Sequence, residues 1–214
     1  MKSLVHLLLI CFSFSGIASA QEVLESGTWH GDVQLNDSVN LGFLFTLKEG
    51  KMTLQNADES IEMSEIVQSG DSFFVKFPFY DSELQFTSIG PVLAGEFINH
   101  AKLTNNVFYF RAIKDLAYRF YADAKSSANI SGRWQLLFDN EEGVNRSNVA
   151  VFRQEGSRIT GTVMTPTGDH RYLDGEINGD QFSLSTFNGA FLMVYKGVLE
   201  KDGTLRGQIG RAHV

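Results

Sequence analysis

The stretch Leu-Gly-Phe-Leu-Phe-Thr-Leu, residues 41–47, decides the fold class. Leu41, Phe43, Phe45 and Leu47 stand at every second position, so they share one face of an extended chain. A period of two is the pattern of a β-strand with one face in a core. The same alternation recurs in further runs, at residues 51–55, 72–79, 83–87, 158–163 and 182–185.

Turn signals separate these runs and predict how the strands are connected. The turn-forming pairs are Glu49-Gly50, Gly70-Asp71, Glu155-Gly156, Gly179-Asp180, Asn188-Gly189 and Asp202-Gly203. Turns about ten to fifteen residues apart are typical of hairpin-connected strands and not of strand–helix–strand units. Eighteen Phe and 20 Gly against three Pro agree with this pattern. The sequence therefore predicts an all-β chain of antiparallel meanders.

The chain repeats itself at intervals of about 105 to 112 residues. Four pairs of segments carry the repeat: Gly27-Thr28-Trp29 with Gly132-Arg133-Trp134, Glu49-Gly50 with Glu155-Gly156, Ser69–Phe73 with Asn178–Phe182, and Leu93-Ala94-Gly95 with Leu205-Arg206-Gly207. The intervals lengthen in small steps, as longer hairpin loops in the second copy would cause. We therefore expect one β unit at 21–98 and a related one at 129–208. A connector at 99–128 joins them and contains one expected strand, Val107 to Ala112.

Each unit opens with a Gly-x-Trp segment, which contains Trp29 in the first unit and Trp134 in the second. This segment followed by a meander occurs in calycin-like barrels of the lipocalin and avidin kind, where the Trp closes one end. Closed barrels, half-barrels packed together and six-stranded, sandwich-like units all agree with the pattern. In each of them we expect both tryptophans to have a structural role. They would plug the core and donate the indole N–H to a backbone carbonyl.

The two ends of the chain differ from the rest. Residues 1–20 combine Lys2, an apolar run and the small-residue site Ala18-Ser19-Ala20, which is the pattern of a cleaved secretory signal peptide. Because the apolar run is too short to span a bilayer, we expect an exported chain without a membrane anchor after cleavage. The last six residues, 209–214, match the translation of a common sequencing-library adapter. We expect them to be an artefact, with the natural sequence departing near Gln208.

The mature chain offers few groups for chemistry. Cys11 is the only cysteine and lies within the signal peptide, so cleavage leaves no thiol and no disulfide. A net charge of −7 opposes binding to nucleic acid, whose phosphates require Lys and Arg. His30, His100 and His170 are too far apart for a local metal motif. The sequence predicts no catalytic residue, no metal and no cofactor.

The densest polar motif is Thr165-Pro166-Thr167-Gly168-Asp169-His170-Arg171-Tyr172. Pro fixes φ, Gly allows a positive φ, and Asp bonds nearby amides, so the motif predicts an ordered hairpin. A second interpretation is a ligand or docking site built by Thr165, Asp169 and Arg171, in which the guanidinium recognises a carboxylate. Both interpretations remain open at this point.

The second unit resembles the N-terminal region of secreted TlpA-like, thioredoxin-fold thiol-disulfide reductases of the Bacteroidetes group. The segments that carry the resemblance are Gly161-Thr162, Thr165–Gly175, Gly179-Asp180 and Leu184–Gly189, with Phe97–Ala101 and Asn129–Trp134 in support. The chain departs from that family at Thr186 and Asn188, where a Cys and an Asp are expected, and it lacks a His expected nearby.

In that family the region precedes a thioredoxin-like domain with a Trp-Cys-x-x-Cys active site. No Cys-x-x-Cys occurs here, so no catalytic residue carries over and no thioredoxin domain is expected in this chain. The resemblance implies the non-catalytic front region of an exported, periplasmic oxidoreductase, with a C-terminal thioredoxin-like domain as its partner. The alternative is a stand-alone exported protein that binds a small ligand in a barrel-like fold.

Overall fold

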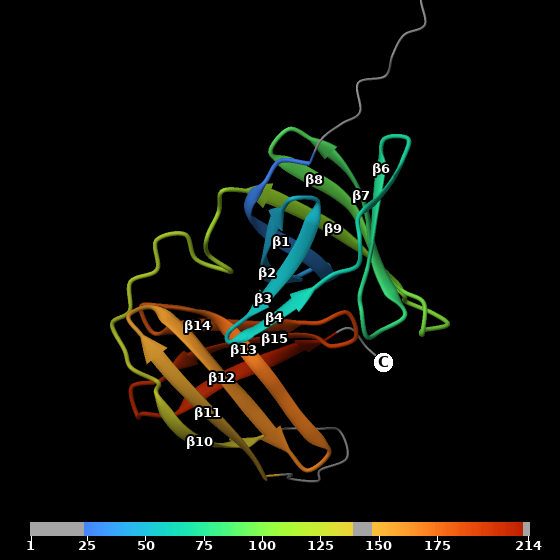
Figure 1. Cartoon of the computed structure of the whole chain (residues 1–214). Coiled ribbons are helices and arrows are strands. Elements are labelled where there is room, and N and C mark those ends of the chain that lie inside the picture. The colour runs from blue at the N-terminus through green and yellow to red at the C-terminus, as the bar shows by residue number, and fades with distance from the viewer. Residues whose placement is uncertain (1–23, 139–146, 212–214) are drawn as a thin grey trace, which may run out of the picture.

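The computed structural model describes residues 24–138 and 147–211, and sixteen β-strands make up their regular structure (Figure 1). No helix occurs in these residues, and therefore none that could cross a membrane. The all-β class predicted from the sequence is confirmed. Two antiparallel sheets form, each curled into a half-barrel, and no thioredoxin-like domain is present in the described ranges.

The first sheet has nine strands in the order β4-β3-β2-β1-β9-β8-β7-β6-β5. Their bounds are β1 (Gly27–Asn36), β2 (Val39–Lys48), β3 (Lys51–Asn56), β4 (Glu59–Glu62), β5 (Val67–Ser69), β6 (Ser72–Lys76), β7 (Ser82–Ile89), β8 (Val92–Asn99) and β9 (Val107–Lys114). The segment between β4 and β5 connects the two edge strands and is hydrogen-bonded to β3 on one side and to β6 on the other. Met63 N–H donates to Met52 O at 2.9 Å, and Ser64 N–H donates to Lys76 O at 3.1 Å.

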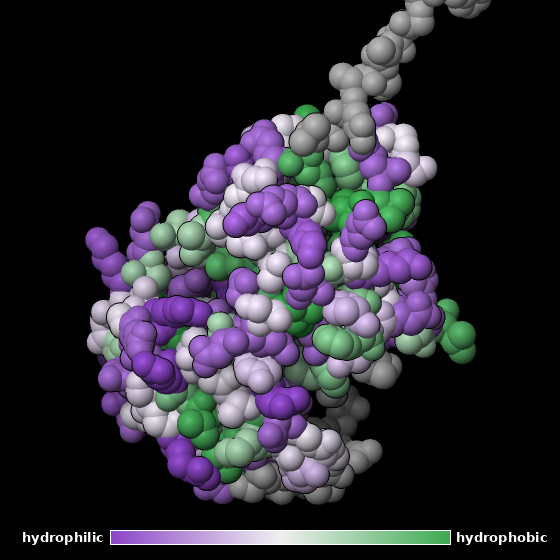
Figure 2. All heavy atoms as spheres, in the orientation of Figure 1, coloured by the Kyte–Doolittle hydropathy of each residue, from purple (hydrophilic) through white to green (hydrophobic). Residues whose placement is uncertain are grey.

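The second sheet has seven strands, which pair in chain order. Their bounds are β10 (Gly132–Leu137), β11 (Ser147–Glu155), β12 (Arg158–Thr165), β13 (Gly168–Asn178), β14 (Gln181–Phe187), β15 (Leu192–Leu199) and β16 (Leu205–Arg211). The edges of this sheet are β10 and β16. Figure 2 shows hydrophilic residues spread over both half-barrels on the face in view.

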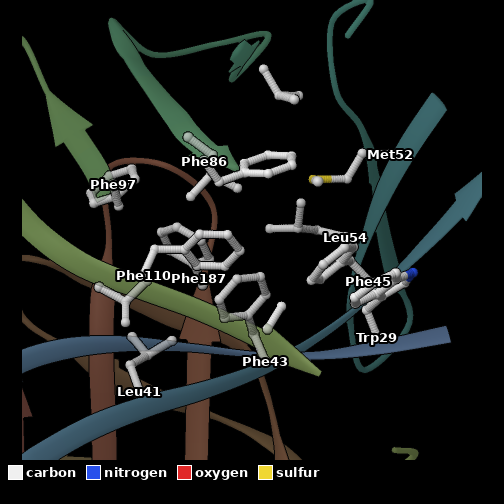
Figure 3. Close-up of a cluster of buried hydrophobic side chains, with 14 of the residues drawn as sticks. Trp29, Leu41, Phe43, Phe45, Met52, Leu54, Phe86, Phe97, Phe110 and Phe187 are labelled. Atoms are coloured by element: carbon white, nitrogen blue, oxygen red, sulfur yellow. The ribbon is translucent and has the colours of Figure 1, made fainter. Parts of the chain in front are cut away.

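The alternating runs build the first core as predicted. Leu41, Phe43 and Phe45 of β2 are fully buried, and Leu47 is nearly so. Their side chains meet those of Met52, Leu54, Phe86, Phe97 and Phe110 inside the half-barrel (Figure 3). The run at 72–79 was predicted too long, because β6 ends at Lys76 and the Phe79 side chain is 78% exposed.

A residue of the second sheet completes the first core. Phe187, at the end of β14, is fully buried, and its ring lies 4.7 Å from that of Phe43 and 5.1 Å from that of Phe97 between centroids (Figure 3). β14 is accordingly buried on both faces. Phe182 and Leu184 face the second core, whereas Ser185 and Phe187 face the first sheet. The two half-barrels therefore share a packed interface.

The repeat seen in the sequence has a structural counterpart. Trp29 pairs with Phe45 in the β1–β2 register, and Trp134 pairs with Ala150 at the same step of β10–β11. Each indole N–H donates to the carbonyl four residues earlier, at 3.2 Å to Glu25 and at 2.8 Å to Ile130. Both indoles thus make a hydrogen bond to a backbone carbonyl, as the sequence analysis expected.

The unit boundaries differ from the expected ones at the connector. The strand expected inside it is β9, which pairs with both β1 and β8, so the first sheet runs to Lys114 and not to residue 98. Sequence alternation marks a strand but does not say which sheet will pair with it. At the other end, β16 extends past Gln208 to Arg211, paired with β15. The signal peptide expected at 1–20 lies outside the described residues.

Candidate functional site

Arg119, in the segment between the two sheets, is the largest charged side chain buried in the described residues, at 2% exposure. Its Nη1 donates to Ser185 Oγ at 2.9 Å and to Gly42 O at 3.4 Å. Its Nη2 donates to Gln55 O and, at 3.4 Å, to Asn56 Oδ1. One guanidinium thus joins β2 and β3 of the first sheet to β14 of the second.

Asp174 of β13 provides the negative charge beside this cation. Its Oδ2 lies 3.6 Å from Arg119 Nε and 3.0 Å from Arg158 Nη2, and it accepts the Ala57 N–H at 3.1 Å. Arg158 Nε also donates to Asp174 Oδ1, at 3.1 Å, so that pair is bidentate. The carboxylate is therefore shared between a buried and a half-exposed arginine.

Glu176, two residues further along β13, fixes the backbone of the connecting segment. Its Oε1 accepts the Arg119 N–H at 2.8 Å and its Oε2 accepts the Phe120 N–H at 2.9 Å. We call Asn56, Arg119, Asp174, Glu176 and Ser185 the junction. Asn56 completes it by donating from Nδ2 to Phe187 O at 2.8 Å.

Burial and charge shift the ionisation of the junction. Burial is the main cause that lowers the pKa of the Arg119 guanidinium, although Asp174 and Glu176 oppose the shift. The hydrogen bond to Asp174 raises the pKa of Arg158. Burial raises the pKa of Glu176 above its ordinary value of 4.5, and the two backbone N–H donors offset part of this. Arginine stays charged throughout, so the junction keeps its cations at physiological pH.

His30 ties β1 to the same connecting segment. Its Nδ1 lies 2.6 Å from Tyr118 O and its Nε2 lies 3.0 Å from Asp32 Oδ2, and the residue is 7% exposed. Burial lowers the pKa of His30, but the bonds to Asp32 and Tyr118 outweigh it, so the pKa is raised above 6.5. Because both ring nitrogens face acceptors, the imidazolium form satisfies both contacts.

Close packing at the junction depends on Gly42. A Cβ at this position would lie 2.2 Å from Arg119 O, so the connecting segment approaches β2 more closely than any side chain allows. This close approach helps to bury Arg119. The junction thus joins the two sheets through a buried guanidinium.

A shallow hollow of about 240 Å³ lies beside the junction. The turn after β3 and the strands β11 to β13 line it, with Ala57, Asp58, Val151, Phe152, Arg153, Thr160, Gly161, Thr162 and Tyr172. A β-bulge interrupts the β12–β13 register here, and Tyr172 has a φ of 58°. A bulky residue in that region is strained, and such bulges often aim side chains at binding sites.

The residues singled out as a ligand or docking site lie at the tip of the β12–β13 hairpin. Thr165 Oγ1 donates to Gly168 O at 2.7 Å and accepts the Thr167 N–H at 3.3 Å, so this hydroxyl closes the turn. Asp169 and Arg171 are exposed, and the Arg171 guanidinium lies 5.6 Å from the centre of the Tyr172 ring. These hydrogen bonds agree with the interpretation of the motif as an ordered hairpin. Asp169 and Arg171 remain accessible to solvent.

The three histidines do not come together. His30 contacts Asp32, His100 contacts Glu83 at 3.1 Å, and His170 contacts Tyr195. Within residues 24–138 and 147–211, no group of three or more His, Cys, Asp or Glu side chains could hold a metal ion.

Sequence reasoning missed the junction. Arg119 stands between the aromatic residues Tyr118 and Phe120 of the connector, and Asp174 lies within the segment Thr165–Gly175 that carries the family resemblance. A signal was present in β13 and β14. Asp174 and Glu176 lie on one face of β13, and their partners Ser185 and Ser183 lie on the same face of β14. Two neighbouring strands thus carry polar residues on a face that another layer of the fold must cover.

The fold and the junction together define a two-sheet, all-β protein whose half-barrels are fixed to one another through buried charge. Comparison with protein-family models, with curated proteins and with solved structures gave no match.

Proposed function

We propose that this chain is the non-catalytic N-terminal β region of an exported, periplasmic thioredoxin-like thiol-disulfide oxidoreductase, and that it is a rigid platform for the redox domain that follows. The observation that carries the proposal is the junction. Arg119 and Asp174 hold the two half-barrels in one orientation, which a platform that positions a second domain requires.

The resemblance of the second unit to secreted TlpA-like reductases supplies the chemical part of the proposal. Such reductases attack a disulfide with a thiolate. The only cysteine of this chain, Cys11, lies in the expected signal peptide, so the thiolate would come from the following domain. The β region then orients that domain or selects the proteins that reach it.

The test compares residues 21–208 alone with the full-length protein that includes the proposed redox domain, which we call the parent. Reduction of a disulfide-linked model substrate by dithiothreitol is followed by turbidity, with equal amounts of each protein. We expect acceleration by the parent only. Activity of residues 21–208 would overturn the proposal, as would a parent whose reading frame past Gln208 contains no Cys-x-x-Cys.

The hollow beside the junction favours a second candidate, a protein that binds a small ligand. The observation behind it is Tyr172, which keeps a strained φ of 58° on the wall of the hollow. Strain of this kind costs about 1–3 kcal/mol and is retained most often where a side chain has a task. The inner face of the first half-barrel is filled by Phe side chains, so the ligand would lie in the hollow.

The Tyr172→Gly variant tests this candidate, because Gly accepts a positive φ without strain. We expect the variant to be at least as stable as the wild-type chain in urea unfolding. We also expect it to lose binding of a ligand that a screen of dyes and metabolites finds for the wild-type chain. Arg171→Ala is the control that removes the neighbouring cation and leaves the backbone unchanged. Equal binding by the wild-type chain and Tyr172→Gly would count against the hollow.

A further inference from the structure

Within the described residues, the second sheet has no counterpart of one strand of the first sheet. In the first sheet, β9 lies between β1 and β8 and pairs with both. The counterparts of β1 and β8 in the second sheet are β10 and β16, and these are its two edges. The remaining strands correspond in order, with β13 standing for β4 and β5 together. We call the interval between the edges of β10 and β16 the seam.

The registers show that β10 and β16 are true counterparts. Trp29 faces Phe45 as Trp134 faces Ala150, which equates β1 with β10. Phe86 faces Gly95 as Gly197 faces Gly207, which equates β8 with β16. A Cβ on Gly95 or Gly207 would lie within 2.4 Å of a backbone oxygen of the neighbouring strand, so the two glycines allow the same close approach.

The seam leaves apolar side chains half covered. Trp29 is fully buried where β9 adjoins β1, whereas Trp134 is only partly buried on the edge strand β10. Leu136 of β10 and Leu205 of β16 also pack against the second core while remaining partly exposed. In the first sheet the corresponding cover comes from Phe108, Phe110 and Ala112 on the inner face of β9, which are buried.

We propose that the seam binds one further β-strand, antiparallel to both β10 and β16, and that the polypeptide following β16 supplies it. The chain order of the first sheet carries this assignment, because β9 follows β8 after the short connection 100–106. This inference rests on the proposed function, in which a further domain follows this region. Free strand edges are templates for pairing, and an eighth strand in the second sheet would cover both edges at once.

The charge at the seam defines the outer face of that strand. Arg133 and Arg206 are exposed and alternate with the inward Trp134 and Leu205. Arg206 Nε lies 3.6 Å from Glu200, and Arg133 has no ion pair within the described residues. In the first sheet the outer face differs, because Asp32 of β1 faces Arg111 of β9. The seam strand therefore has apolar residues at alternate positions and acidic residues between them, with a carboxylate beside Arg206.

The first experiment fills the seam with the protein's own strand. Residues 100–114 are fused directly after Arg211, so that a copy of β9 follows β16 as β9 follows β8. The copy carries Arg111→Glu, because Arg111 pairs with Ala94 in the first sheet and would face the corresponding Arg206 in the second. We expect Trp134 emission to shift to shorter wavelength and the seam-facing amides of β10 to exchange more slowly, on the order of tenfold. The control fusion carries Phe108→Ser and Phe110→Ser in the copy and should leave both quantities unchanged. Equal behaviour of the two fusions would overturn the inference.

The second experiment uses the parent protein, with the polypeptide that follows β16, and measures exchange of the same amides against those of the isolated chain. Slower exchange in the parent supports the inference. Equal exchange overturns it, even where the parent reduces disulfides and the proposed function stands. Protected β10 amides in a parent without reductase activity would leave the inference in place and overturn the proposed function. Protection that depends on protein concentration would assign the seam to a second copy and overturn the inference.

Discussion

The two sheets begin with the same Gly-x-Trp segment, yet they bury its tryptophan to different extents. In the first sheet Trp29 is stacked on Phe45, with ring centroids 6.2 Å apart, and it has no exposed surface. In the second, Trp134 lies on the edge strand β10 and is partly exposed. The indole hydrogen bond is the same in both. The difference arises from β9, which pairs with β1 and has no counterpart beside β10 in the residues that the structure describes.

The largest expected effect sharpens this comparison directly. Trp29→Ala should lower the free energy of unfolding by about 4–5 kcal/mol, because a large, fully packed side chain leaves a cavity. Trp134→Ala should cost less, since part of its surface is already in water. Urea unfolding followed by far-ultraviolet circular dichroism measures both. Equal losses would mean that the second core is as well covered as the first.

The next prediction concerns the residue that both cores share. Phe187→Ala should cost about 3–4 kcal/mol, because the ring fills a site among Phe43, Phe77 and Phe97 of the first core. Phe182→Ala, five residues earlier on the face of β14 toward the second core, is the matched control. Hydrogen exchange should show that Phe187→Ala weakens strands of the first sheet, whereas Phe182→Ala leaves them protected. The opposite distribution would contradict a shared core.

Removing the buried cation should have a somewhat smaller effect. Arg119→Met keeps much of the volume but leaves Asp174 with Arg158 alone, and we expect a loss of about 3 kcal/mol. Arg153→Met is the control, since Arg153 is exposed and its ion pair with Glu155 should contribute at most about 1 kcal/mol. Two separate unfolding transitions in Arg119→Met would show that the junction couples the two half-barrels. A single, unshifted transition would refute its role.

The smallest expected effect is on pH dependence. The pKa of Glu176 is raised above 4.5 and that of His30 is raised above 6.5. Each group therefore contributes stability that is fully present when the pH is below its ordinary pKa, and this stability is lost as the pH rises through its raised pKa. From these two groups, stability should therefore decline as pH rises above 4.5 and again as it rises above 6.5.

His30→Gln is the variant that isolates the upper part of this pH window. The groups facing His30 are Asp32, Tyr118 and Glu176. The variant should flatten the decline above pH 6.5, whereas His100→Gln, which contacts Glu83 near the surface, should leave it unchanged. Thermal unfolding across a pH series measures both. A decline that is the same in His30→Gln would assign the pH dependence to other residues.

Much of the fold could be predicted from the sequence because its cause is local. Alternation in residues 41–47 and the turn pair Glu49-Gly50 fix a strand and its hairpin within a dozen residues. The repeat of Trp29 at Trp134 predicted two related units and a common indole bond. The hydroxyl of Thr165 closes the hairpin that the Pro-Thr-Gly-Asp motif indicated.

The candidate site could be predicted only in part. Nothing near Arg119 in the sequence indicates that its guanidinium meets Gln55, Asn56 and Ser185, each more than 60 residues away. Alternation predicted the strand that became β9, but it did not show that this strand belongs to the first sheet and not to a separate connector.

The sequence by itself determined the all-β class, the strands, the turns and the two-unit repeat, because alternation and turn chemistry act between residues close along the chain. Only the tertiary structure decided that β9 pairs into the first sheet, why Arg119 is buried and that β10 and β16 are the edges of the second sheet in the described residues. Those features depend on contacts between segments that lie far apart along the chain, which local alternation and turn chemistry do not specify.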